Sequence, residues 1–134
     1  MNIETSPDYR KALKEISKKK YSGVYGTVTQ EIKNFFKEYS SFESIWHKTF
    51  MLFENDIVRV NKIRLENEMQ NSGKSGGYRI IVLCDRRTQT VGLLYIYPKV
   101  GPLGQLDIPK DKSKDLVRNY KKAKLDKAVE SLEF

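Results

Sequence analysis

Residues 73–83 read GKSGGYRIIVL, and this glycine-rich turn with the apolar run after it decides how the chain is expected to fold. Working outward, three short segments are rich in β-branched and aromatic residues and bounded by turn residues, which is typical of strands. These predicted strands span residues 57–66, 77–85 and 90–98. The charged link 85–89 suits a hairpin loop. The turn itself lacks the upstream glycine and the following helix of a phosphate-binding P-loop.

Two amphipathic helices are predicted before the strands. Over residues 8–20, apolar side chains recur at helical spacing, at Tyr9, Ala12, Leu13 and Ile16. After breaks at Gly23 and Gly26, Thr27 and Gln30 have the spacing of a capping box at the start of a second helix. The apolar stripe of this second helix is formed by Val28, Ile32, Phe35, Phe36 and Tyr39. The two helices are close enough in sequence to form a hairpin that needs a sheet to cover its apolar faces.

The remaining segments complete an α+β fold in a single domain, residues 1–134. Residues 40–56 form a dense apolar patch, expected to pack under the sheet, and His47 lies within it as a packing residue. Residues 110–133 read as a basic helix whose apolar positions shift in phase near Leu125, which predicts a bend or a different packing partner. The expected architecture is an N-terminal helical hairpin packed on a small antiparallel sheet of three to four strands, with a C-terminal helix. Residues 2–5 are the candidate for the fourth strand.

The distribution of apolar residues and the small number of cysteines and histidines exclude several classes of protein. No apolar run is long enough to cross a bilayer, and no signal-peptide segment stands at the N-terminus, so the chain is expected to be cytoplasmic. One cysteine, Cys84, excludes an internal disulfide, and its apolar neighbours indicate a buried thiol. With one histidine and one cysteine, no transition-metal site and no cofactor are expected.

The net charge of +8 is concentrated in two places. Residues 57–99 hold eight Lys and Arg against three Asp and Glu, and residues 110–134 hold eight against five, while the rest of the chain balances. Such an excess favours a polyanionic partner, either nucleic acid or an acidic protein. On the predicted strands, Lys62, Arg64, Arg79 and Lys99 are interleaved with Tyr78, Tyr95 and Tyr97. Cations on a rigid sheet beside aromatic rings suit a phosphate backbone with unstacked bases.

The ordered series K-I-R at 62–64, G-K-S-G-G-Y-R at 73–79 and I-Y-x-K at 96–99 resembles the RelE/ParE superfamily of bacterial toxins, most of all its HigB-like branch. The resemblance is strong over residues 57–99, co-linear from about residue 8 to 97, and fades after Lys99. It implies the toxin of a type II toxin–antitoxin system. Such a toxin is a metal-independent endoribonuclease that cleaves mRNA, often on the ribosome, and inhibits translation and growth. The implied partners are mRNA, the ribosome and a helix-turn-helix antitoxin that covers the basic face.

The resemblance also assigns roles to residues. Lys62 and Arg64 match the family's K-x-K or K-x-R pair, Arg79 matches its strand arginine at the scissile phosphate, and Lys99 matches the basic position that closes the next strand. Lys62, Arg64, Arg79 and Lys99 are therefore the candidate catalytic residues. The candidate RNA-binding residues are Arg59, Lys74, Tyr78 and Tyr97.

The sequence departs from the family pattern after the last strand. RelE-type enzymes carry an arginine there and a tyrosine nearer the C-terminus, but here Val100-Gly101-Pro102-Leu103-Gly104 follows Lys99, and Tyr120 is too far downstream to match. The general base is therefore unassigned; Lys62, His47, Tyr97 and a ribosomal group are the candidates. Two other classes stay open: a ParE-like inhibitor of a DNA topoisomerase, and a non-catalytic module that binds RNA or the ribosome.

Overall fold

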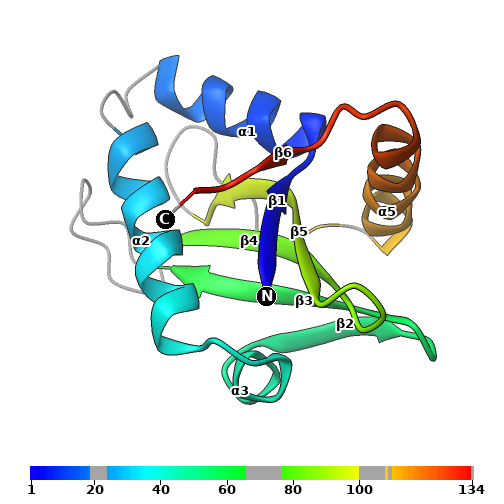
Figure 1. The fold of residues 1–134 in the computed structure, drawn as a ribbon. Helices are drawn as coiled ribbons and strands as arrows, with labels where there is room; N and C mark the ends of the chain where they lie inside the picture. Colours follow the sequence, from blue (N-terminus) through cyan, green and yellow to red (C-terminus); the bar gives the residue numbers. More distant parts are fainter. Residues whose placement is uncertain (19–23, 66–76, 100–107, 109, 134) are drawn as a thin grey trace.

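The computed structural model of the chain describes residues 1–18, 24–65, 77–99, 108 and 110–133. The described residues form an α+β fold in which a twisted sheet lies between helices on both of its faces (Figure 1). In chain order the elements are β1 (Asn2–Thr5), α1 (Pro7–Lys18), α2 (Val24–Glu38), α3 (Phe42–His47), β2 (Phe50–Glu54), β3 (Val58–Leu65), β4 (Tyr78–Asp85), β5 (Thr90–Pro98), α5 (Lys110–Leu125) and β6 (Glu130–Ser131). Among these, no helix is long and apolar enough to cross a membrane.

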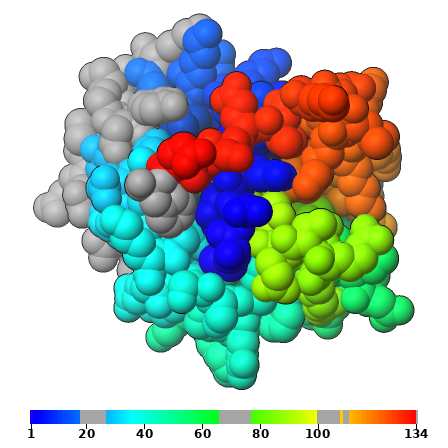
Figure 2. All heavy atoms as spheres, viewed as in Figure 1, coloured from blue at the N-terminus to red at the C-terminus, as the bar shows by residue number. Residues whose placement is uncertain are grey.

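The sheet has six strands in the order β2-β3-β4-β5-β1-β6. The pairs β2–β3, β3–β4, β4–β5 and β1–β6 are antiparallel, whereas β1 lies parallel to β5. The expected three-to-four-stranded antiparallel sheet is thus too small, and its purely antiparallel character is wrong. The difference has two causes: the N-terminal strand joins beside β5 in parallel, and short strands extend both edges. Figure 2 shows the β6 segment, in red, lying over β1, in dark blue.

The three N-terminal helices cover one face of the sheet. Their buried side chains form one core with the strand residues that point to this face, and we call it the helical-hairpin face. The predicted stripes are confirmed, since Tyr9, Leu13 and Ile16 of α1 and Val28, Ile32 and Phe36 of α2 are buried there. Helix α1 begins at Pro7 because the hydroxyl of buried Ser6 accepts a hydrogen bond from the backbone N–H of Tyr9 at 3.1 Å.

Helix α5 covers the other face, which we call the α5 face. Leu116, Val117 and Tyr120 pack there against residues of β3, β4 and β5. The close approach depends on Gly92, because a Cβ atom at this position would lie 2.6 Å from Cζ of Tyr120. The Tyr120 hydroxyl donates a 2.7 Å hydrogen bond to Glu4 on β1, and this bond fixes the helix relative to the N-terminal strand.

Several predicted boundaries are wrong for identifiable reasons. Helix α2 already begins at Val24, so Thr27 and Gln30 lie inside the helix and do not form its capping box. The apolar patch 40–56 contains α3, whose capping box is made by Ser41 and Ser44, and the edge strand β2. The C-terminal helix ends at Leu125, where the chain reverses through Lys127 at φ 56° and enters β6. The phase shift in the sequence therefore marks the end of the helix.

Candidate nucleic-acid interface

The register of β3, β4 and β5 brings three of the predicted catalytic cations together. Across the three strands, Arg64 pairs with Arg79, and Arg79 pairs with Tyr97. Two residues along each strand, Lys62 pairs with Ile81, and Ile81 pairs with Tyr95. Directly paired residues on adjacent strands point to the same side of the sheet. Because Ile81 and Tyr97 belong to the α5 core, Lys62, Arg64 and Arg79 all start from the α5 face. We call these three residues the cation row.

The members of the cation row differ in how far they reach solvent. Arg64 is exposed and Lys62 is half-buried, whereas Arg79 is only 3% exposed. One guanidinium nitrogen of Arg79 donates to the carbonyl oxygen of Tyr78 at 3.3 Å. Lys62 and Arg64 are therefore the cations that an anionic ligand meets first, and Arg79 adds positive charge from within the sheet.

Phe50 on β2 orders the two outer cations. Its ring lies opposite Lys62 in the β2–β3 register and is 52% exposed. The Arg64 guanidinium carbon lies 4.3 Å from the ring centroid, and the Lys62 ammonium lies 5.9 Å from it, both within cation–π range. The sequence does not single out Phe50, because only the β2–β3 register, with its irregularity between Met51 and Phe53, shows which residue of the apolar patch faces Lys62.

Two residues predicted to contact RNA lie on the opposite, helical-hairpin face. Tyr78 is 1% exposed and packs in that core. Arg59 alternates with Lys62 along β3, and its guanidinium carbon lies 4.5 Å from the ring centroid of Trp46 on α3. Tyr78 is thus a core residue of the helical-hairpin face, and Arg59 lies on the face opposite the cation row.

The other predicted residues are placed as follows. Tyr97 is buried on the α5 face at the end of the Arg64–Arg79 pairing, with its ring centroid 6.2 Å from that of half-buried Tyr95. Lys99 is half-buried, follows β5 directly, and its backbone N–H donates to the carbonyl oxygen of Gly77 at 2.8 Å. Lys74 lies outside the described residues.

Helix α5 adds a cation that the sequence did not single out. The ammonium group of Lys112 lies 4.4 Å from the ring centroid of Tyr95 and 3.4 Å from its hydroxyl oxygen. Lys112 thereby extends the positive charge of the α5 face from β3 across to the helix.

Other conspicuous groups of the chain lie away from the cation row. His47 ends α3, which packs on the helical-hairpin face, and it is exposed. Cys84 is fully buried on the same face, where burial raises the pKa of its thiol to about 11 even though the charges of Arg59 and Arg86 oppose that shift. Neither residue is placed to act on a ligand bound at Lys62 and Arg64. Within the described part of the chain, no group of three or more His, Cys, Asp and Glu residues is arranged to hold a metal ion.

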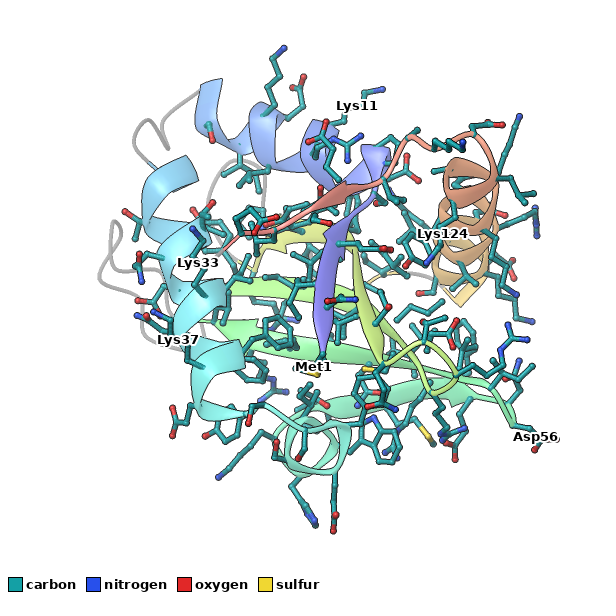
Figure 3. The ribbon with its side chains drawn as sticks, in the orientation of Figure 1. Met1, Lys11, Lys33, Lys37, Asp56 and Lys124 are labelled. Atoms are coloured by element: carbon teal, nitrogen blue, oxygen red, sulfur yellow. The ribbon has the colours of Figure 1, made fainter. Side chains whose placement is uncertain are left out.

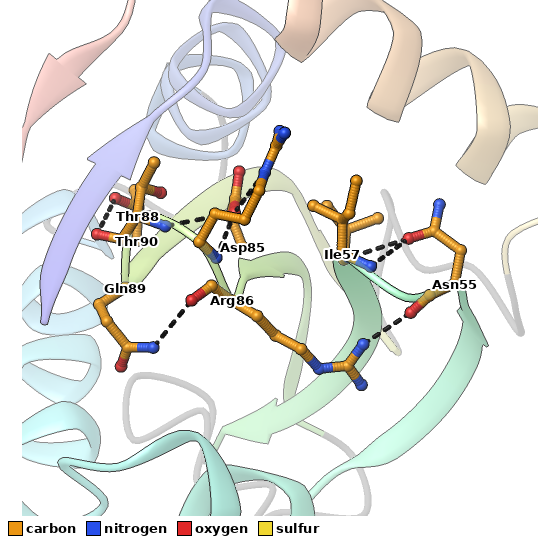
Figure 4. A network of polar contacts seen from close by, with 9 residues as sticks. Asn55, Ile57, Asp85, Arg86, Thr88, Gln89 and Thr90 are labelled. Atoms are coloured by element: carbon orange, nitrogen blue, oxygen red, sulfur yellow. Dashed lines mark hydrogen bonds and ion pairs between the residues drawn. The ribbon is translucent and has the colours of Figure 1, made fainter.

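The far end of the sheet uses its arginines structurally (Figure 4). Arg86, in the β4–β5 hairpin, donates to the carbonyl oxygen of Asn55 at 2.6 Å and to the carboxylate of Glu54 at 2.9 Å. Asp85 accepts the backbone N–H of Arg87 at 2.9 Å. The Arg86 contacts join the β4–β5 hairpin to the β2–β3 hairpin about 20 Å from Arg64, because six residue steps of β3 separate Val58 from Arg64. The Arg86 side chain therefore stabilises this end of the sheet.

Comparisons of the chain with protein-family models, with curated proteins and with solved structures give no match.

Proposed function

We propose that this protein is the toxin of a type II toxin–antitoxin system, an endoribonuclease that cleaves mRNA on the ribosome with the cation row of its α5 face. The observation that carries the proposal is the strand register, which sets Arg64 beside Arg79 and places Lys62 on the same side of the sheet. These are the residues that the RelE/ParE-like motifs single out. Like charges directly opposed on neighbouring strands repel each other, and a phosphate bound beside them would offset part of that repulsion.

The reaction proposed is attack of a ribose 2′-oxygen on the adjacent phosphorus. The P–O5′ bond breaks, leaving a 2′,3′-cyclic phosphate on one fragment and a 5′-hydroxyl on the other. A base takes the 2′-hydroxyl proton, and an acid supplies the proton to the leaving 5′-oxygen. Lys62 and Arg64 would neutralise the charge that develops on the phosphorane, with Arg79 adding to the field from below. Preorganised charge of this kind supplies a large share of transition-state stabilisation.

Lys62 is the residue of the cation row that we propose for proton transfer. Arginine keeps its proton in proteins, so neither Arg64 nor Arg79 can accept one. Tyr97 is 1% exposed and His47 lies on the other face of the sheet, which leaves Lys62 or a group of the ribosome. A toxin that lacked this base would be a non-catalytic RNA-binding module on the same surface.

The proposed partner is an antitoxin whose acidic segment covers the cation row. A net charge of +8 would speed its encounter with such a partner and with RNA alike.

Expression of the protein without its partner, followed by mapping of transcript 5′ ends, tests the proposal. We expect growth arrest with new 5′-hydroxyl ends inside open reading frames. The variant carrying Lys62→Ala and Arg64→Ala should relieve both effects while remaining folded. Lys37→Ala is a single-cation control, because Lys37 is an exposed cation on α2, which packs on the helical-hairpin face (Figure 3). Growth arrest without new 5′ ends would favour the non-catalytic module or a topoisomerase inhibitor.

A further inference from the structure

A cleft opens at the end of the cation row, between α1 and α5. It has a volume of about 670 Å³, and its floor is the C-terminal half of β5, including Tyr95 and Tyr97. Strand β1 pairs with β5 only as far as Leu93, so α1 and α5 bound β5 beyond that point. The cleft lies two strand spacings, about 10 Å, from Lys62 and Arg64, because β4 separates β3 from β5.

The charges that line the cleft are mixed, unlike those of the cation row. Three carboxylates and two lysines face it: Asp8, Lys11 and Glu15 from α1, and Lys112 and Asp115 from α5. Their sum is −1 in a chain of net charge +8. An inorganic phosphate alone would therefore gain little here, whereas a ligand with both an anionic group and hydrogen-bond donors would find partners for each.

The carboxylates of the cleft are only partly engaged. Asp8 accepts one hydrogen bond from the side-chain amide of Asn119 at 3.0 Å, and Asp115 forms an exposed ion pair with Arg118 on its own helix at 3.0 Å. For Glu15, which is exposed on α1, no ion pair is present among the described residues. Acceptor oxygens therefore remain for a ligand that donates hydrogen bonds.

We infer that this cleft binds one nucleotide of the RNA and selects a base that carries an exocyclic amine, in preference to uracil. The inference rests on the proposed function. The Tyr95 ring lies on the floor of the cleft and holds the Lys112 ammonium 4.4 Å from its centroid. Lys112, seated on that ring, and Lys11 face the nucleotide's phosphate, and the carboxylates accept hydrogen bonds from the amine, as Asp and Glu do from cytosine N4. Uracil has no exocyclic amine, so it leaves the carboxylate acceptors without that donor.

The test uses binding rather than cleavage. Fluorescein-labelled 2′-O-methyl hexamers of uridine and of cytidine lack the attacking hydroxyl, so their dissociation constants can be measured by anisotropy at one fixed salt concentration. We expect the wild-type protein to bind the cytidine hexamer about fivefold more tightly, the low end of what one side-chain–base contact discriminates. Replacing two cleft carboxylates (Glu15→Gln with Asp115→Asn) should bring this ratio to about one.

A charge-matched control separates the cleft from general electrostatics. The double variant Glu43→Gln with Glu133→Gln removes the same two negative charges from exposed positions that do not line the cleft, and it should keep the wild-type ratio. Equal affinity of the wild-type protein for both hexamers would overturn the inference, as would a preference that survives in the cleft variant. Cleavage of mRNA on programmed ribosomes, measured in parallel, reports on the proposed function alone. If cleavage occurs and the two hexamers bind equally, only the inference fails.

Discussion

Replacing Gly92 by alanine should destabilise the protein, because β5 and α5 leave no room for a side chain between them. The added Cβ would lie 2.6, 2.8 and 2.9 Å from Cζ, Cε1 and Oη of Tyr120. The ring would have to move, which strains the 2.7 Å hydrogen bond from its hydroxyl to Glu4. Overpacking costs about 1–3 kcal/mol, and a weakened bond to a carboxylate adds about 1 kcal/mol. Alanine loses less backbone entropy than glycine when the strand forms, which offsets about 0.5–1 kcal/mol of this cost.

The net expectation is a loss of about 1–3 kcal/mol in the free energy of unfolding. Urea denaturation followed by circular dichroism measures it as a lower midpoint with an unchanged slope. A second background isolates the cause: in a Tyr120→Ala protein the alanine at 92 should cost little, because the clashing ring is gone. A Gly92→Ala protein as stable as the wild type, or an equal cost in both backgrounds, would refute the packing described for the α5 face.

Three further predictions concern the cation row and the buried thiol. Lys62→Ala and Arg64→Ala should each reduce the rate of mRNA cleavage on ribosomes by roughly a hundredfold or more. The combined loss in the double variant should be less than additive, because both side chains would serve one phosphate. Full additivity in a double-mutant cycle would place them at separate sites. The Lys62→Arg variant should bind 2′-O-methyl RNA about as well as the wild-type protein. It should cleave unmodified RNA far more slowly, since a guanidinium hardly gives up its proton. Near-normal cleavage by this variant would make Lys62 a phosphate ligand only. Burial raises the pKa of the Cys84 thiol from 9.0 to about 11, so the thiol ionises at lower pH in the unfolded protein than in the folded one. The free energy of unfolding should therefore fall as pH rises from about 9 through 11, and the thiol should have no effect on stability below that range. The difference in pH slope between wild type and Cys84→Ala measures this contribution, and identical slopes would contradict it.

The central strands and the helical stripes could be predicted from the sequence because their patterns are local. β-Branched runs bounded by turn residues placed β3, β4 and β5 within one or two residues of their observed ends. Helical spacing identified the buried side of α1 and α2. The edge strands were missed because β2 and β6 are short, with little or no burial pattern of their own, and are defined by the strands they pair with.

The arrangement of the candidate site residues could be predicted in part for the same reason. Lys62 and Arg64 are two residues apart on one strand, so their common side follows from the sequence once the strand is assigned. That Arg79 stands beside Arg64 depends on the β3–β4 register, which no local pattern fixes. Tyr78 looked equivalent to its neighbour Arg79, but adjacent residues on a strand point to opposite faces, and Tyr78 is in the core. Lys112 and the α1–α5 cleft arise only from how distant segments pack.

The central claim is that the cation row cleaves RNA through the ribose 2′-hydroxyl. The most direct measurement is analysis of fragment ends after purified protein is incubated with mRNA-programmed ribosomes, with the Lys62→Ala and Arg64→Ala double variant as the control for contaminating nucleases. We predict fragments that end in a 2′,3′-cyclic phosphate and begin with a 5′-hydroxyl for the wild-type protein, and none for the double variant. Intact mRNA after incubation with folded wild-type protein, or equal cleavage by the double variant, would contradict the claim.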